Sequence, residues 1–129
     1  MAVLVAYDGL EHTKKALDYA IEYALVFGKK LYILTDIPSK DKLDMDEEMA
    51  RIGEAQKEAE ALARERGVDV QAVVCSGTPQ KGILDAAERF SADVIVVGRS
   101  DKTFLDRAIL GSTSEAVIRN ANCTVIVVQ

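Results

Sequence analysis

The chain has 129 residues, a formal net charge of −5, and a composition that is 49% apolar but only 5% aromatic. This length predicts a single domain over residues 1–129, with a core of aliphatic side chains. The acidic balance argues against nucleic acid or an anionic membrane surface as the main partner, because both require a basic face. No apolar run approaches the ~20 residues that span a bilayer, and a strand-like run already begins at Val3, so we expect a cytoplasmic protein without a signal peptide.

The first half of the chain predicts two strands and two helices. A short apolar run at residues 3–6 predicts a strand, and apolar residues at helical spacing follow it until Gly28, which is suited to end a helix. Next come a strand at residues 31–34, a polar loop at 38–46 and a charged amphipathic helix at 47–66. The apolar positions of the two helices are Ala16, Leu17, Ala20, Ile21, Ala24 and Leu25 in the first, and Met49, Ile52, Ala59 and Leu62 in the second.

The second half continues the alternation of strands and helices. A strand at residues 68–74 alternates apolar and polar residues at its start, which predicts that it is less buried than the others. Pro79 suits the first position of a third helix. A strand at 94–97, a helix at 112–120 and a strand at 125–128 complete the chain. Because the strands are nearly all apolar and alternate with helices at short spacing, we predict a doubly wound α/β domain with a five-stranded parallel sheet covered by helices on both faces.

The segment from Val94 to Thr113 carries the main functional signal. The strand that ends at Gly98 lets another group come close, because glycine has no side chain. Ser112 is followed three residues later by Glu115, which is the spacing of a capping box and predicts a helix N-terminus, where free N–H groups favour an anion. Doubly wound sheets bind ligands beyond the carboxyl ends of their strands. This segment is therefore a candidate phosphate site, although helix capping uses the same donors and both interpretations stay open.

These residues resemble the universal stress protein family. The phosphate motif of that family is glycine, two residues, glycine, nine residues, glycine, and serine or threonine. It is matched here by Gly98, Gly111 and Ser112, with Asp101 in place of the second glycine. Further similar segments, in chain order, lie at residues 5–9, 77–79, 92–98 and 123–128.

The resemblance implies a flavodoxin-like, Rossmann-like sheet with strand order 3-2-1-4-5, and an adenine nucleotide (ATP, ADP or AMP) as ligand, bound with little or no turnover. Asp8 would hold the ribose or the adenine. The implied nucleotide-binding residues are Ala6, Asp8, Leu34, Val97, Gly98, Arg99, Asp101, Gly111, Ser112 and Thr113. The resemblance also implies a homodimer that pairs through the last strand, at Thr124, Val125, Ile126, Val127 and Val128.

Asp101 separates two functional hypotheses. A carboxylate near a triphosphate is repelled by ~4 kcal/mol per charge pair at ~4 Å and an effective dielectric near 20, and by ~1 kcal/mol in open water. Arg99, Lys102 and Arg107 supply nearby positive charge, and a Mg²⁺ ion could bridge Asp101 to the phosphates. The first hypothesis is a nucleotide-binding stress or regulatory protein that is at most a slow ATPase. The alternative is a dimeric protein-interaction module that has lost nucleotide binding and has other proteins as partners.

The remaining reactive residues predict no second site. Cys75 and Cys123 lie at opposite edges of a sheet with the implied order, too far apart for a disulfide. Neither cysteine belongs to a metal-binding pattern, and His12 is the one histidine of the chain, so we expect no metal held by the protein alone.

Overall fold

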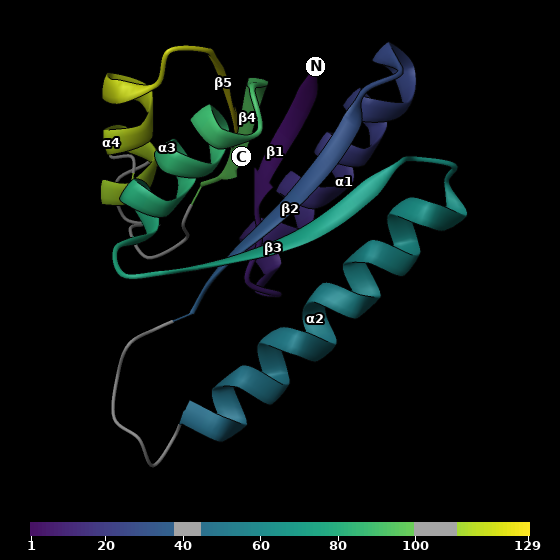
Figure 1. Cartoon of the computed structure of the whole chain (residues 1–129), viewed down its shortest axis with the longest axis vertical. Coiled ribbons are helices and arrows are strands. Elements are labelled where there is room, and N and C mark those ends of the chain that lie inside the picture. The colour runs from purple at the N-terminus through teal and green to yellow at the C-terminus, as the bar shows by residue number, and fades with distance from the viewer. Residues whose placement is uncertain (38–44, 100–110) are drawn as a thin grey trace.

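The computed structural model describes residues 1–37, 45–99 and 111–129, which form a sheet flanked by helices (Figure 1). The sheet is five-stranded, parallel throughout, and ordered β3-β2-β1-β4-β5. The predicted doubly wound α/β fold and its strand order are therefore confirmed. In chain order the elements are β1 (Ala2–Ala6), α1 (Glu11–Phe27), β2 (Lys30–Ile37), α2 (Met45–Glu65), β3 (Val70–Ser76), α3 (Pro79–Arg89), β4 (Ala92–Gly98), α4 (Ser112–Asn120) and β5 (Thr124–Val128).

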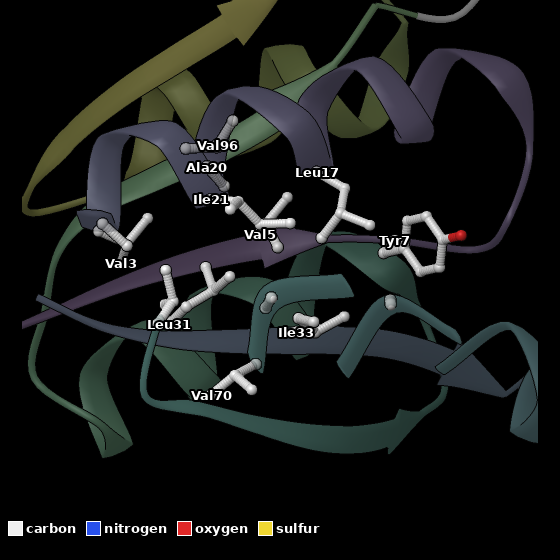
Figure 2. Close-up of a cluster of buried hydrophobic side chains, with 14 of the residues drawn as sticks. Val3, Val5, Tyr7, Leu17, Ala20, Ile21, Leu31, Ile33, Val70 and Val96 are labelled. Atoms are coloured by element: carbon white, nitrogen blue, oxygen red, sulfur yellow. The ribbon is translucent and has the colours of Figure 1, made fainter. Parts of the chain in front are cut away.

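Two apolar clusters lie on opposite faces of the sheet. Successive side chains of β1 alternate between them: Val3 and Val5 belong to the cluster under α1 and α2, and Leu4 belongs to the cluster under α3 and α4. Figure 2 shows the first cluster, with Leu17 and Ile21 of α1 packed on β1. Each of these side chains contributes roughly 1.5–3 kcal/mol when fully buried. Burial on both faces explains why the strands are nearly all apolar in sequence.

The helix ends follow local sequence rules. Gly28 ends α1 in the left-handed conformation, with φ of 63°, and its N–H bonds the Ala24 carbonyl. Pro79 is the first residue of α3, where its missing N–H costs nothing. Both positions agree with the sequence prediction.

Two strands extend further than their apolar runs predicted. β2 continues to Ile37 rather than ending at residue 34, because residues 35–37 pair with residues 74–76 of β3. β3 begins at Val70 rather than at residue 68 and continues to Ser76. The extra residues include Thr35, Asp36 and Ser76, whose polar side chains interrupt the apolar pattern by which the strands were delimited. They bring Asp36 and Cys75 to the carboxyl edge of the sheet.

The helical packing of α1 and α2 differs from the sequence prediction in three side chains. Leu25, Met49 and Leu62 are exposed, at 44%, 46% and 40%, although all three were assigned to buried faces. The predicted positions Ile52 and Ala59 of α2 are almost fully buried, and so is Ala63, which was not predicted. Small residues at the contact let α2 lie close to the sheet, so the longer apolar side chains at the border of the stripe extend into solvent.

The two edge strands are less buried than the three central ones. Most residues of β3 and all residues of β5 are half-buried or exposed, whereas β1 and β4 are mainly buried. The third strand is less buried than β1, β2 and β4, as predicted, but β5, which contains no buried residue, departs from that prediction. None of the helices in the described part of the chain is long and apolar enough to cross a membrane.

Candidate functional site

A cleft of about 470 Å³ lies at the carboxyl edge of the sheet, within the size range of small-ligand sites. The ends of β1, β2, β3 and β4 contribute to it, together with the N-terminal parts of all four helices. Eight of the predicted nucleotide-binding residues line this cleft, and they come from five different segments. They are Ala6, Asp8, Leu34, Val97, Gly98, Gly111, Ser112 and Thr113.

Arg99, a ninth predicted residue, is not among the described residues that line the cleft. The backbone N–H of Arg99 donates to the Val128 carbonyl at 2.8 Å, and its guanidinium lies 3.5 Å from Gln129 Oε1. The structure thus places Arg99 against the end of β5. Asp101 lies outside the described residues, as do Lys102 and Arg107.

Asp8 is held in a hydrogen-bonded turn between β1 and α1. Its Oδ1 accepts from the Leu10 N–H and from Thr13 Oγ1, both at 2.8 Å. The bond from Leu10 is an Asx-turn, in which the side chain replaces a backbone acceptor. Within the described part of the chain, no hydrogen bond reaches Oδ2 of Asp8. One carboxylate oxygen therefore orders the turn, and the other is available to a ligand in the cleft.

A buried hydroxyl fixes the backbone beside Asp8. Thr35 is 1% exposed, and its Oγ1 donates to the Tyr7 carbonyl at 2.7 Å. The Tyr7 N–H donates to the Leu34 carbonyl at 2.9 Å, so β1 and β2 stay joined one residue past the end of β1. A hydrogen bond to a buried carbonyl is worth about 0.5–1.5 kcal/mol. These bonds fix the position of the backbone next to Asp8 at the carboxyl edge of the sheet.

Arg51 of α2 reaches the same turn from a distant part of the sequence. Its Nη1 donates to the Asp8 carbonyl at 2.9 Å, and its Nη2 pairs with Glu48. The bond to Glu48 raises the pKa of Arg51 and lowers that of Glu48. Sequence reasoning missed Arg51, because a charged residue in a charged helix gives no local signal. Only the packing of α2 beside β2 and β3 brings it to the cleft.

Gly98 is required by packing against α1. A Cβ atom at this position would lie 2.2 Å from the His12 carbonyl oxygen and 2.9 Å from its carbon. Gly98 is not one of the glycines with positive φ, so space rather than backbone conformation selects glycine here. The close approach that the sequence predicted is real, and the group that approaches is the first turn of α1.

The N-terminus of α4 differs from the predicted capping box. Gly111 is the N-cap, Ser112 is the first helical residue, and the N-cap makes no side-chain capping bond. Glu115 instead pairs with Arg119 at 2.8 Å. The first backbone bond of the helix runs from the Glu115 N–H to the Gly111 carbonyl. The N–H groups of residues 112–114 therefore have no acceptor within the helix, and these residues line the cleft.

The far end of the cleft, at β2 and β3, is acidic. Cys75 Sγ donates to Asp36 Oδ1 at 3.4 Å, and both residues line the cleft. Burial raises the pKa of Asp36 above its usual value. Burial and the neighbouring Asp36 raise the pKa of the Cys75 thiol to about 12, so the thiol stays protonated at neutral pH. This end of the cleft disfavours a phosphate and can accept hydrogen bonds.

The described residues contain no group of three or more histidine, cysteine or acidic side chains that could hold a metal ion. Cys75 and Cys123 are both free thiols. Of the charged side chains that line the cleft in the described part of the chain, Asp8, Asp36 and Glu48 are acidic and Arg51 is basic. Among the described residues that line the cleft, the helix amides of α4 are the electropositive feature at the β4 end.

Comparisons with known proteins agree on one family. The model of the universal stress protein family matches residues 1–129. A universal stress protein of Methanocaldococcus jannaschii is 31% identical, over 98% of this chain and 81% of the relative. The structure of the Archaeoglobus fulgidus universal stress protein in complex with dAMP is 26% identical with a TM-score of 0.80, over 100% of this chain and 98% of that one. A universal stress protein in complex with cAMP is 25% identical with a TM-score of 0.81, over 100% and 97%. The chain belongs to the universal stress protein family.

Proposed function

We propose that this protein binds an adenine nucleotide in the cleft at the carboxyl edge of the sheet, with little or no turnover. The observation that carries the proposal is that one cleft joins Asp8 to the N–H groups of Ser112, Thr113 and Ser114, which have no acceptor within α4. Helix N-termini with free amides bind phosphate through both their N–H donors and their dipole. The relatives solved with dAMP and with cAMP support an adenine nucleotide as the ligand class.

The arrangement of charge along the cleft orients the nucleotide. Its phosphates lie at the β4 end, against α4, because the β2–β3 end carries Asp36. The base then lies near Leu34 of β2, two strands from β4, with Ala6 of the intervening β1 beside it, because neighbouring strands are ≈ 4.8 Å apart. The sugar lies over β1, between the two, where the free carboxylate oxygen of Asp8 accepts from ribose hydroxyls. Val97, Gly98 and Gly111 form the wall beside the phosphates.

We further propose ATP as the physiological nucleotide, with Mg²⁺ bridging its phosphates to Asp101. The support comes from sequence and charge: an acidic residue replaces a glycine of the phosphate motif, and a divalent ion turns the resulting repulsion into attraction. In this proposal, Arg99 contacts the phosphates only if its side chain leaves its position at the end of β5 when the nucleotide binds.

Isothermal titration with ATP, ADP and AMP tests the nucleotide and its metal together. We expect saturable binding of all three, with ATP affinity reduced by EDTA and AMP affinity nearly unchanged. Equal ATP affinity with and without EDTA would rule out the bridging metal. Absence of heat and of protection against thermal unfolding with every nucleotide would rule out the binding function itself.

Gly98 favours a second candidate function. Because packing against His12 already requires glycine there, this part of the motif would persist in a protein that had lost nucleotide binding. Such a protein would be a dimeric module that binds other proteins. Native mass spectrometry of the purified protein separates the two functions: co-purified ATP or AMP supports nucleotide binding, and an empty dimer supports the interaction module.

We propose that the protein pairs with a second copy through β5. β5 is at the sheet edge, and its residues are half-buried or exposed although four of the five are apolar. The Val128 carbonyl accepts from Arg99 of the neighbouring segment, so by alternation the peptide groups of Val125 and Val127 point away from β4. An apolar edge with free peptide groups is a template for strand pairing.

Exposed aromatic residues on α1 extend this surface. Tyr19 and Phe27 are 47% and 58% exposed, and with Tyr23 they lie four residues apart on one flank of the helix. Lys29 lies over the Tyr23 ring and pairs with Asp93 of β4, so the flank is on the β4 side of α1. Ile126 and Val128 of β5 pack partly on the same apolar cluster.

Val127→Pro removes an outward N–H of β5 and leaves the β4–β5 hydrogen bonds in place. Proline is tolerated on edge strands for this reason. We expect a dimer for the unmodified protein and a monomer for Val127→Pro by analytical ultracentrifugation, with circular dichroism unchanged. Ile126→Lys should give the same result through charge repulsion at the interface. A dimer that survives both substitutions would exclude the β5 edge.

A further inference from the structure

We propose that Arg51 is a positioning residue for ligand binding, which acts by holding the β1–α1 turn that presents Asp8. The inference rests on the proposed nucleotide function. Arg51 is separated from Asp8 by 43 residues in sequence and belongs to a different helix, α2. Its role is therefore to connect α2, on one side of the cleft, to the residue that contacts the sugar.

The first support is the direct contact. Arg51 Nη1 donates to the Asp8 carbonyl at 2.9 Å, with Asp8 itself lining the cleft. Hydrogen bonds from a charged donor are stronger than neutral ones, so this bond opposes rotation of the Asp8–Gly9 peptide. Glu48 pairs with Nη2 and keeps the guanidinium turned toward the cleft rim.

The second support is the backbone of the turn. Gly9 has φ of +87°, a backbone conformation that glycine adopts readily and other residues adopt rarely. Glycine also has more backbone freedom than any other residue, so this turn needs other restraints. A Cβ at Gly9 would lie 3.2 Å from Ala55 Cβ and 3.6 Å from Arg51 Nη1, so α2 covers this turn closely. Without Arg51, the turn would keep the bonds of Asp8 with Leu10 and Thr13 and the bond from Thr35 to Tyr7, but within the described part of the chain it would have no hydrogen bond from α2.

The third support is the position of Arg51 relative to the phosphate end. Arg51 contacts the turn after β1, whereas residues 111–114 follow β4 on the other side of that turn. Since the sugar lies over β1, loss of Arg51 should weaken the contact of Asp8 with the ribose hydroxyls and leave the phosphate contacts intact. This separates a positioning role from a direct ionic contact with phosphate.

The experiment compares Arg51→Met with the unmodified protein, using ATP and 2′,3′-dideoxy-ATP as ligands in isothermal titration. Methionine keeps much of the aliphatic stem of Arg51 and removes its donors. Arg64→Met is the matched control, because Arg64 also lies in α2 and pairs with a glutamate of its own helix, Glu60, at 2.9 Å. Arg64 does not line the cleft.

We expect Arg51→Met to weaken ATP binding by about tenfold, the equivalent of one charge-assisted hydrogen bond, and to leave 2′,3′-dideoxy-ATP binding unchanged. Arg64→Met should change neither affinity. An equal loss for both ligands would show that Arg51 contacts phosphate or supports the whole fold, and no loss for ATP would show that the bond to Asp8 is unimportant; either result overturns the inference. If the unmodified protein binds neither ligand, the proposed function fails first, and that outcome is distinct from both.

Discussion

The two junctions that meet in the cleft, β1 to α1 and β4 to α4, are built in opposite ways. At the first, Oδ1 and the backbone carbonyl of Asp8 are engaged by Leu10, Thr13 and Arg51, and only Oδ2 accepts no hydrogen bond from the described residues. At the second, the N-cap Gly111 makes no side-chain bond and the following amides have no acceptor in their helix. The first junction is ordered by its own hydrogen bonds, whereas the second presents amides that have no acceptor within α4. Under the proposed function, a nucleotide would gain its orientation mainly from the first junction and its binding energy mainly from the second.

Gly98 links the two junctions, because it lies at the end of β4 and contacts the first turn of α1. Gly98→Ala should lower the free energy of unfolding by about 1–3 kcal/mol, since the added methyl group would overlap the His12 carbonyl, a backbone atom that cannot rotate away. Urea unfolding measures this difference.

Gly53→Ala is the control for that substitution. Apart from the backbone of α2 itself, no atom of the described residues lies within 4 Å of a Cβ at Gly53, in the interior of α2, so alanine there should stabilise the protein by roughly 0.5–1 kcal/mol. Effects of the same sign and size at both positions would show that Gly98 is not selected by its contact with α1.

Thr35→Val tests how far the first junction depends on a buried hydrogen bond. The substitution keeps the shape of the side chain but leaves the Tyr7 carbonyl without the Thr35 Oγ1 donor, at a cost of about 1–2 kcal/mol. Thr113→Val at the second junction should cost less than about 0.5 kcal/mol. If the two substitutions lowered the free energy of urea unfolding equally, the first junction would not depend more on its hydrogen bonds than the second.

Asp36→Asn tests the acidic end of the cleft through pH. Burial raises the folded pKa of Asp36, so the stability linked to its proton is present below the unfolded pKa, roughly 3.9, and is lost as pH rises through the folded pKa. The amide side chain introduced by Asp36→Asn does not ionise, so this loss of stability does not occur, and its oxygen can still accept the hydrogen bond from Cys75. We expect a gain of less than about 1 kcal/mol at pH 7 that disappears near pH 3.5. A gain independent of pH would exclude the titration of Asp36 as its cause.

Ser112→Ala should have the smallest effect on stability. An N-cap serine contributes about 1 kcal/mol, but Ser112 is the first helical residue and Gly111 is the N-cap. We therefore expect a change below roughly 0.5 kcal/mol in thermal or urea unfolding. A loss of unfolding free energy near 1 kcal/mol would instead indicate that Ser112 caps the helix, as the sequence spacing predicts.

Most of the fold could be predicted because local signals agree with the global arrangement. Gly28 and Pro79 mark helix ends that the structure confirms, and the apolar runs predict the number and order of the strands. The signals failed where polar residues continue a strand, as at Asp36 and Cys75, and where small residues form the contact of a helix, as at Ala63. In both cases tertiary packing determines which residues pair or become buried, and the hydropathy pattern of the sequence does not predict it.

The candidate site was predictable only in part. The positions after β1 and β4 follow from the rule that such sheets bind ligands at carboxyl ends of strands, and eight predicted residues lie together in one cleft. Arg51 and Thr35 were not predictable, because their roles depend on contacts with Tyr7 and Asp8 across the fold. The reason for Gly98 was also hidden, since a glycine that admits a helix and a glycine that admits a phosphate look the same in sequence.

The most direct test of the account is to map where a nucleotide binds. Titration of ¹⁵N-labelled protein with AMP should shift the amide resonances of Ser112, Thr113 and Ser114 at one end of the cleft, and of residues near Leu34 at the other, with saturation at a single affinity. Shifts confined to other surfaces, or no shifts at millimolar AMP, would contradict the proposal that the two junctions form one nucleotide site.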